Sequence, residues 1–214
     1  MTYRTLVTIG QLAEQRHGLI TAEWLSKAGL SPSQKTSLVT SGYLDRVTRG
    51  VYRVAGVPAF ESMDILAYWM RLGDNDYSGT PTLVAAGATA AHLHGIGDMW
   101  PDPYDFITSC PRRTRDPNVI LRHEPIDSAD VTTVEGVPCL SPIATLVDLV
   151  KAHGDLSLVG DAVRDARWKR YLNEYTEPEF VRRLGALAGA NGLPDGDGQQ
   201  LFDMITQGLP EVRD

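Results

Sequence analysis

Residues that could carry acid–base or metal chemistry are few in this sequence. His92 and His94 form an HxH pair, but residues two apart on a helix do not share a face, and no cysteine or acidic residue lies at ligand spacing from them. A packed or helix-terminal role is therefore predicted for both histidines. Asp161 and Asp165 lie one helical turn apart among basic residues, which indicates a solvated helix face of mixed charge rather than a catalytic pair.

Signatures of other catalytic and cofactor sites are incomplete. The DGDG at 195–198 resembles the start of a calcium loop, but Gln200 and Thr206 occupy the positions where that loop requires glycine and glutamate. The chain has no GxSxG elbow, no phosphate-binding glycine loop and no CxxC. We therefore predict no catalytic residues, no bound metal, no cofactor and no enzymatic activity.

Charge is divided unevenly along the chain. Seven lysines and arginines against three acidic residues give residues 1–57 a net charge of +4. The whole chain carries −7, so residues 58–214 carry −11, and this split predicts different partners for the two halves. A locally basic surface can attract DNA phosphates even on an acidic protein, because salt screens charges more than about 10 Å away.

One basic cluster, formed by Arg112, Arg113 and Arg115, lies in the acidic half. It falls in the segment PRRTRDPN, which is interpreted as a turn between two strands. The cluster is either an exposed turn, which is the favoured interpretation, or a secondary phosphate contact.

Spacing and capping residues predict two helices before residue 30. Apolar residues recur at helical spacing over 6–13, and Thr21 is placed to cap a short helix over 22–28. Gly29 then supplies the tight turn into the next helix.

The third predicted helix has the clearest start in the chain. Ser31 and Gln34 form a capping box around a proline at the first helical position. Leu38 and Val39 are its predicted apolar members. The other face can approach a DNA groove, because short polar side chains hydrogen-bond to phosphates and base edges. The DNA contacts predicted on this helix are Ser33, Gln34, Lys35, Ser37 and Thr40.

An alternating pattern follows Gly42. The sequence LDRVTRGVYRV predicts a β-hairpin with a tight turn over 48–50, whose arginines can contact phosphates or the minor groove. Three helices followed by a hairpin predict a winged helix-turn-helix that binds DNA. A protein-interaction module with solvated arginines is the alternative. The DNA contacts predicted in the hairpin are Arg46, Thr48, Arg49 and Arg53.

The rest of the chain mixes helical and extended patterns. The predicted fold class is therefore α+β, with a winged helix-turn-helix over 1–57 and a mixed domain with a small sheet and several helices over 58–214. Strands are expected over 104–110, 119–123, 131–134 and 137–140, the last two joined by a turn at Glu135-Gly136. Helices are expected over 60–72, 86–94, 143–153, 156–172, 178–188 and 199–206, with a loop over 74–79.

Targeting features and cysteine usage bear on localisation. No apolar run approaches the roughly 20 residues that span a membrane, and the N-terminus lacks the pattern of a secretory signal. Cys110 and Cys139 are the only cysteines, too few for a disulfide framework. We therefore expect a cytoplasmic protein without a membrane partner.

Three segments resemble the AbiEi antitoxins of bacterial abortive-infection toxin–antitoxin pairs. The stretch LAEQRHGLITAEWLSKAGLSPSQKTSLVTSGYLDRVTRGVYRV is similar to the N-terminal winged helix of that family. The stretches AHLHGI and VEGVPCLSPIATLVDL are similar to its C-terminal domain, so the resemblance covers about residues 6–150. Many relatives have an arginine-rich third helix, where this chain has SPSQKTSLVTSG.

This resemblance implies an antitoxin that represses its own operon. The N-terminal domain would bind inverted repeats in its own promoter as double-stranded DNA. The C-terminal domain would neutralise a nucleotidyltransferase-like toxin encoded beside it, with or without direct contact. The alternatives are a stand-alone transcriptional regulator and a protein-interaction module without a toxin partner.

Overall fold

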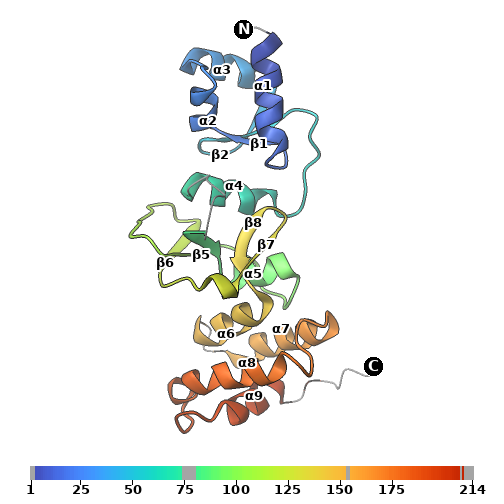
Figure 1. Ribbon diagram of the computed structural model, residues 1–214, viewed down its shortest axis with the longest axis vertical. Coiled ribbons are helices and arrows are strands. Elements are labelled where there is room, and N and C mark those ends of the chain that lie inside the picture. Colours follow the sequence, from blue (N-terminus) through green and yellow to red (C-terminus); the bar gives the residue numbers. More distant parts are fainter. Residues whose placement is uncertain (1–2, 74–80, 153–154, 208, 210–214) are drawn as a thin grey trace. The chain divides into compact units, whose positions relative to one another are not determined.

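The computed structural model describes residues 3–73, 81–152, 155–207 and 209 (Figure 1). The chain divides into two units, Met1–Gly79 with Glu135–Val137 and Thr80–Val134 with Pro138–Asp214. Helices and strands are mixed throughout, which confirms the predicted α+β class. The predicted loop over 74–79 lies outside the described residues, and the predicted domain boundary after residue 57 stays a prediction.

The N-terminal unit has the topology of a winged helix-turn-helix. Its three-stranded antiparallel sheet has the order β1-β3-β2, with α2 and α3 as the helix-turn-helix and β2–β3 as the wing. The sequence patterns do not predict β1, because its three residues are all buried and show no alternation. The elements are α1 (Tyr3–Glu14), β1 (Leu19–Thr21), α2 (Ala22–Lys27), α3 (Pro32–Thr40), β2 (Leu44–Thr48), β3 (Val51–Val54) and α4 (Met63–Leu72).

Side-chain caps begin α2 and α3 where they are predicted. Thr21 Oγ1 accepts a hydrogen bond from the Trp24 amide at 3.3 Å. Ser31 Oγ accepts a hydrogen bond from the backbone amide of Gln34 at 3.3 Å, and Gln34 Oε1 accepts one from the backbone amide of Ser31 at 2.8 Å. This reciprocal pair confirms the capping box and satisfies helix N-terminal donors that have no partner within the helix. Gly29 makes the intervening turn at φ +87, which glycine adopts without strain.

The two faces of the three-stranded sheet have different neighbours. Paired residues share a face, so Leu44 and Val54 lie on one face, while Asp45 and Arg53 lie on the other. The face of Leu44 packs against α1–α3, and the opposite face contacts α4. Val39, predicted on the apolar side of α3, is instead 37% exposed. The buried core on the helical face contains Ile9, Ala13, Ile20, Leu25, Leu30, Leu38, Leu44 and Val54.

In the part of the C-terminal half that the structure describes, five strands form one mixed sheet, accompanied by five helices. The strand order is β6-β5-β4-β8-β7. The strands are β4 (Leu83–Ala85), β5 (Tyr104–Thr108), β6 (Val119–His123), β7 (Val131–Val134) and β8 (Val137–Leu140). The helices are α5 (Gly87–His94), α6 (Pro142–Ala152), α7 (Leu156–Trp168), α8 (Glu177–Leu184) and α9 (Gly198–Thr206), with 3-10 turns η1 (Ser128–Asp130), η2 (Gly185–Leu187) and η3 (Gly189–Asn191).

Strand pairing departs from the sequence interpretation at one place. β5 and β6 run parallel, with Tyr104 opposite Val119, so residues 109–118 form a crossover connection and the predicted turn is wrong. The predicted turn at Glu135-Gly136 is confirmed, with φ values of +47 and +80. β4 is not predicted, because its three buried residues again give no period.

The helices of this half share one apolar core. It is formed by residues of α5, α6, α7, α8 and α9. The bounds of α7, α8 and α9 agree with the predicted helices to within a few residues. The predicted helix over 156–172 ends at Trp168, and the one expected from residue 60 begins at Met63. The largest side chains of the core include Ile96, Leu146, Leu149, Phe180, Leu184 and Phe202.

Candidate nucleic-acid interface

The exposed face of α3 has hydroxyl groups that can reach a ligand. Ser33, Ser37 and Thr40 are exposed, and their spacing places them on one side of the helix. Among the described residues, the side-chain hydroxyls of Ser37 and Thr40 have no hydrogen-bond partner, while Ser33 Oγ lies 3.0 Å from Ser31 Oγ. The exposed Val39 adds methyl groups of the kind that contact thymine methyls. Sequence reasoning missed Val39, because its residue type suggests the core.

Two other predicted contacts on α3 already serve the fold. Gln34 Oε1 is used in the capping box, which leaves the amide nitrogen for a ligand. Lys35 Nζ donates to Ser26 Oγ at 2.8 Å and to the Ala22 carbonyl at 3.4 Å. The single cation on α3 therefore ties that helix to α2, and much of its hydrogen-bonding capacity is satisfied within the protein.

The wing presents two arginines to solvent. Arg46 is exposed on β2, and within the described ranges its one hydrogen bond is a long contact, 3.4 Å, from Nε to the Thr48 carbonyl. Arg49 is exposed at the β2–β3 turn and has no partner among the described residues. Both guanidinium groups keep the paired N–H donors that bind a phosphate in bidentate fashion.

The other two predicted wing contacts face α4. Arg53 Nη2 pairs with Asp45 Oδ2 at 2.9 Å, and its Nε is buried without a hydrogen-bond partner in the described part of the chain. The Thr48 hydroxyl accepts a hydrogen bond from Arg71 of α4 at 3.3 Å. The structure therefore divides the predicted wing residues into an exposed pair and a pair with partners inside the protein: Thr48 with α4, and Arg53 with the neighbouring strand.

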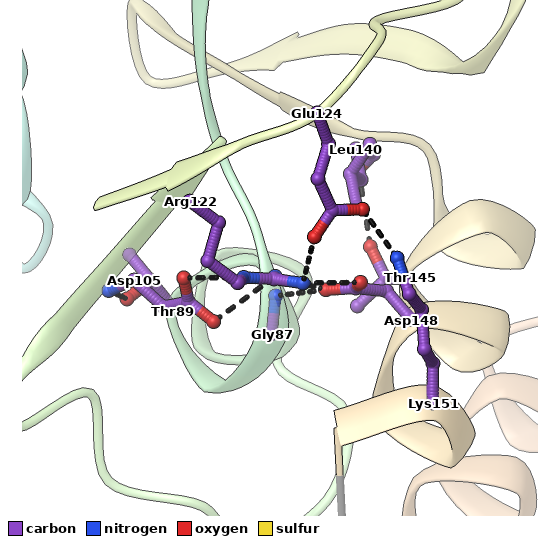
Figure 2. Close-up of polar contacts among 9 residues, drawn as sticks. All are labelled: Gly87, Thr89, Asp105, Arg122, Glu124, Leu140, Thr145, Asp148 and Lys151. Atoms are coloured by element: carbon purple, nitrogen blue, oxygen red, sulfur yellow. Dashed lines mark hydrogen bonds and ion pairs between the residues drawn. The ribbon is translucent and has the colours of Figure 1, made fainter. Parts of the chain in front are cut away.

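A second polar cluster surrounds Arg122 in the C-terminal unit. Figure 2 shows its guanidinium between the carboxylates of Asp105 and Asp148. Arg122 donates to Asp105 at 3.0 and 3.1 Å, to Asp148 at 2.8 and 2.6 Å, and to Glu124 at 3.1 Å. Lys151 pairs with the other oxygen of Glu124. Five side chains from β5, β6, α6 and the residue after β6 thus form one ion network.

Burial and charge act together on the pKa values of this network. Burial alone would lower the pKa of Arg122, but the hydrogen bonds and charges of Asp148 and Asp105 raise it, so the guanidinium stays protonated. Burial raises the pKa of Asp105 above its usual value, against the opposing effect of Arg122. Sequence reasoning missed the network, although a carboxylate inside the apolar run LVDLV was a usable signal.

The network is arranged to hold the sheet and helices rather than to react. Asp148 Oδ2 also accepts from the Gly87 amide at 2.9 Å, which satisfies the start of α5. Gly87 has φ +49, and a Cβ there would lie 2.4 Å from Asp105 Oδ2, so only glycine fits. Each buried carboxylate is thus already bound to cations or amides, which leaves few of its lone pairs for a metal.

The paired histidines have the packed, helix-terminal positions predicted for them. His94 is buried at the end of α5 and its Nε2 donates to the Leu140 carbonyl at 2.7 Å. Burial lowers the pKa of His94. His92 packs edge-on against Trp100 at 5.8 Å. Within the described ranges, no three His, Cys, Asp or Glu side chains converge as metal ligands, and no helix is long and apolar enough to cross a membrane.

The N-terminal fold and its exposed polar surface define a winged helix-turn-helix, a class built to place one helix and one hairpin on DNA. Residues 8–55 match the family model described as "Transcriptional regulator, AbiEi antitoxin". This match covers α2, α3, the wing and most of α1, and it confirms the resemblance stated for this segment. A comparison of the sequence with curated proteins gave no match.

A solved structure resembles nearly the whole chain. The crystal structure of the RV2827C protein from Mycobacterium tuberculosis has a TM-score of 0.51 with this chain at 19% sequence identity. The similarity covers 95% of this chain and 81% of that chain. At this level of identity it shows a shared fold, which extends beyond the winged helix into the α+β half.

Proposed function

We propose that this chain is a DNA-binding antitoxin that represses its own promoter and neutralises a nucleotidyltransferase-like toxin encoded beside it. Residues 1–57 would bind inverted repeats in the promoter as double-stranded DNA, and residues 58–214 would act on the toxin. The proposal is for a non-enzymatic protein of the cytoplasm. The observation that carries it is the match of residues 8–55 to antitoxin transcriptional regulators, in a segment that folds as a winged helix.

The proposed DNA contacts combine two kinds of side chain. On α3, Ser33, Ser37 and Thr40 would reach base edges or phosphates, because their hydroxyls are short and exposed. On the wing, Arg46 and Arg49 would supply most of the phosphate attraction. Gln34, Lys35, Thr48 and Arg53 would act mainly by holding α3 and the wing in place, since each has a partner within the protein.

A binding assay on the chain's own upstream region tests the DNA-binding half of the proposal. Fluorescence anisotropy of the full chain with a duplex from that region, at 50–200 mM salt, should give binding that weakens steeply with salt. A scrambled duplex of equal length is the control for sequence preference. Absence of binding to either duplex at 50 mM salt, where phosphate contacts are strongest, would contradict the repressor role.

The antitoxin half needs a separate experiment. Expression of the adjacent nucleotidyltransferase-like gene should arrest growth, and co-expression of this chain should restore it. The variant R46A/R49A, expressed from an unrelated promoter, should still restore growth, because it alters only the proposed DNA contacts. Growth arrest that persists with the wild-type chain would limit the protein to the role of a stand-alone regulator.

A further inference from the structure

The basic side chains of the C-terminal unit are mostly neutralised by carboxylates. In the described part of this unit, Arg113 and Arg115 have no ion pair, and neither do Lys169 and Arg170 at the end of α7; the adjacent Arg112 is half-buried and is not free of partners. Arg113 and Arg115 are both exposed on the crossover between β5 and β6. Each of the other described cations of the unit has at least one carboxylate partner, as in Arg122–Asp148, Lys151–Glu124, Arg164–Asp161, Arg167–Glu177, Arg182–Glu179 and Arg183–Asp130.

Local hydrogen bonds order the crossover that carries these two arginines. The Cys110 amide donates to Thr108 Oγ1 at 3.2 Å, and the Asp116 amide donates to Thr114 Oγ1 at 3.0 Å. The loop is also joined at both ends to paired strands. Holding the backbone in this way lowers the entropy lost when the loop binds a partner.

Exposure alternates along this part of the loop, so neighbouring side chains differ in their access to solvent. Arg113 and Arg115 are exposed, whereas Thr114 between them is half-buried. The loop sequence SCPRRTRDPN has no aromatic and no large aliphatic residue. It therefore lacks the apolar anchors of a protein interface and keeps the planar, multiply donating groups that recognise phosphate.

We propose that the loop over 109–118 is a second contact for the phosphates of double-stranded DNA, with Arg113 and Arg115 as the contacting residues. The inference rests on the proposed DNA-binding function and adds to it a contact outside the winged helix. The acidity of the unit as a whole does not oppose it, because charges more than about 10 Å away are screened at physiological salt. Each arginine binds one phosphate and releases the counterions held there.

The salt dependence of DNA binding by the full chain tests this contact. For R113A/R115A, the slope of log affinity against log KCl concentration should fall by about 1.8, because each lost phosphate contact removes about 0.9. Affinity at 0.1 M KCl should drop roughly tenfold. R113K/R115K should keep most of the slope, since the charge remains. R164A/R182A is the charge-matched control, because it also removes two positive charges but from ion-paired helix positions, and it should leave the slope unchanged.

Three other results would contradict this contact or the function on which it rests. If R113A/R115A keeps the wild-type slope while R46A/R49A lowers it, the loop assignment fails and the proposed function stands. If R113A/R115A binds DNA normally but no longer neutralises the toxin, the loop contacts an acidic protein surface and the DNA assignment is wrong. If the wild-type chain does not bind DNA at 50 mM salt, the proposed function fails first and this contact fails with it.

Discussion

Arg53 Nη2 lies 2.9 Å from Oδ2 of Asp45, its direct cross-strand neighbour in the wing. This pair lies on the sheet face that contacts α4, whereas Arg46 and Arg49 of the same hairpin are exposed. The sequence pattern does not distinguish Arg46, Arg49 and Arg53, but their surroundings in the fold differ. Substitutions at them should therefore have separable effects on DNA binding and on stability.

Substitution of the exposed wing arginines should lower the affinity for DNA by a similar factor whatever the DNA sequence. For R46A/R49A we expect a salt slope that is shallower by about 1.8, because two phosphate contacts are lost. The melting temperature should be nearly unchanged, since neither side chain has an ion pair in the described structure. Anisotropy titrations at several salt concentrations measure the slope, and thermal unfolding measures stability.

The matched control is R53A in the same hairpin. It should lower stability by about 0.5–1 kcal/mol, because it removes a half-exposed ion pair, and it should change the salt slope much less than R46A/R49A. If R53A lowers the slope as strongly as either exposed arginine does, the division of the wing into binding and packing arginines is incorrect.

Substitutions in α3 should separate stability from sequence preference. S31A removes the N-cap acceptor of the Gln34 amide and should cost about 1 kcal/mol of unfolding free energy. S37A should leave stability within about 0.5 kcal/mol, because its exposed hydroxyl has no described partner. S37A should instead change which duplex the chain prefers. Denaturant unfolding and competition between duplex variants measure the two effects, and an unaltered preference in S37A would remove this residue from the proposed contacts.

The Arg122 network should be the most sensitive polar site in the C-terminal half. R122M leaves Asp105 and Asp148 as partly buried carboxylates without their shared cation, which should cost about 3 kcal/mol. K151M removes an exposed partner of Glu124 and should cost less than about 1 kcal/mol. Urea unfolding of both variants provides the comparison. Equal, small effects would mean that solvent replaces Arg122 as the partner of these carboxylates.

Stability should fall with acid because of His94. The pKa of this buried imidazole is lowered in the folded state, so the unfolded chain binds a proton near pH 6.5 before the folded chain does. The unfolding free energy should therefore be constant above about pH 7 and decrease as the pH falls below 6.5. H94Q should lose this component, measured by denaturant unfolding between pH 7.5 and 5.5. The neighbouring variant H92Q should keep it, and parallel pH profiles for H94Q and the wild type would assign the acid sensitivity to another group.

Short-range signals in the sequence determined much of this protein. The cap at Thr21, the capping box at Ser31 and the turn at Glu135-Gly136 are each made by residues within three positions of one another, and all are found as predicted. The helices, the wing and the family resemblance of residues 8–55 follow from the same local patterns. Such signals are readable because a residue's own backbone preferences and nearest hydrogen bonds decide them.

Tertiary structure alone decided which distant residues became partners. β1 and β4 are short buried strands that exist through their pairing, and β5 with β6 is parallel although the chain between them suggested a turn. Arg122 joins Asp105, 17 residues before it, to Asp148, 26 residues after it. The sequence shows these charged residues but not the distances between them. Chain topology and the exclusion of water determine which cations form ion pairs inside the protein. The same selection left Arg46, Arg49, Arg113 and Arg115 exposed.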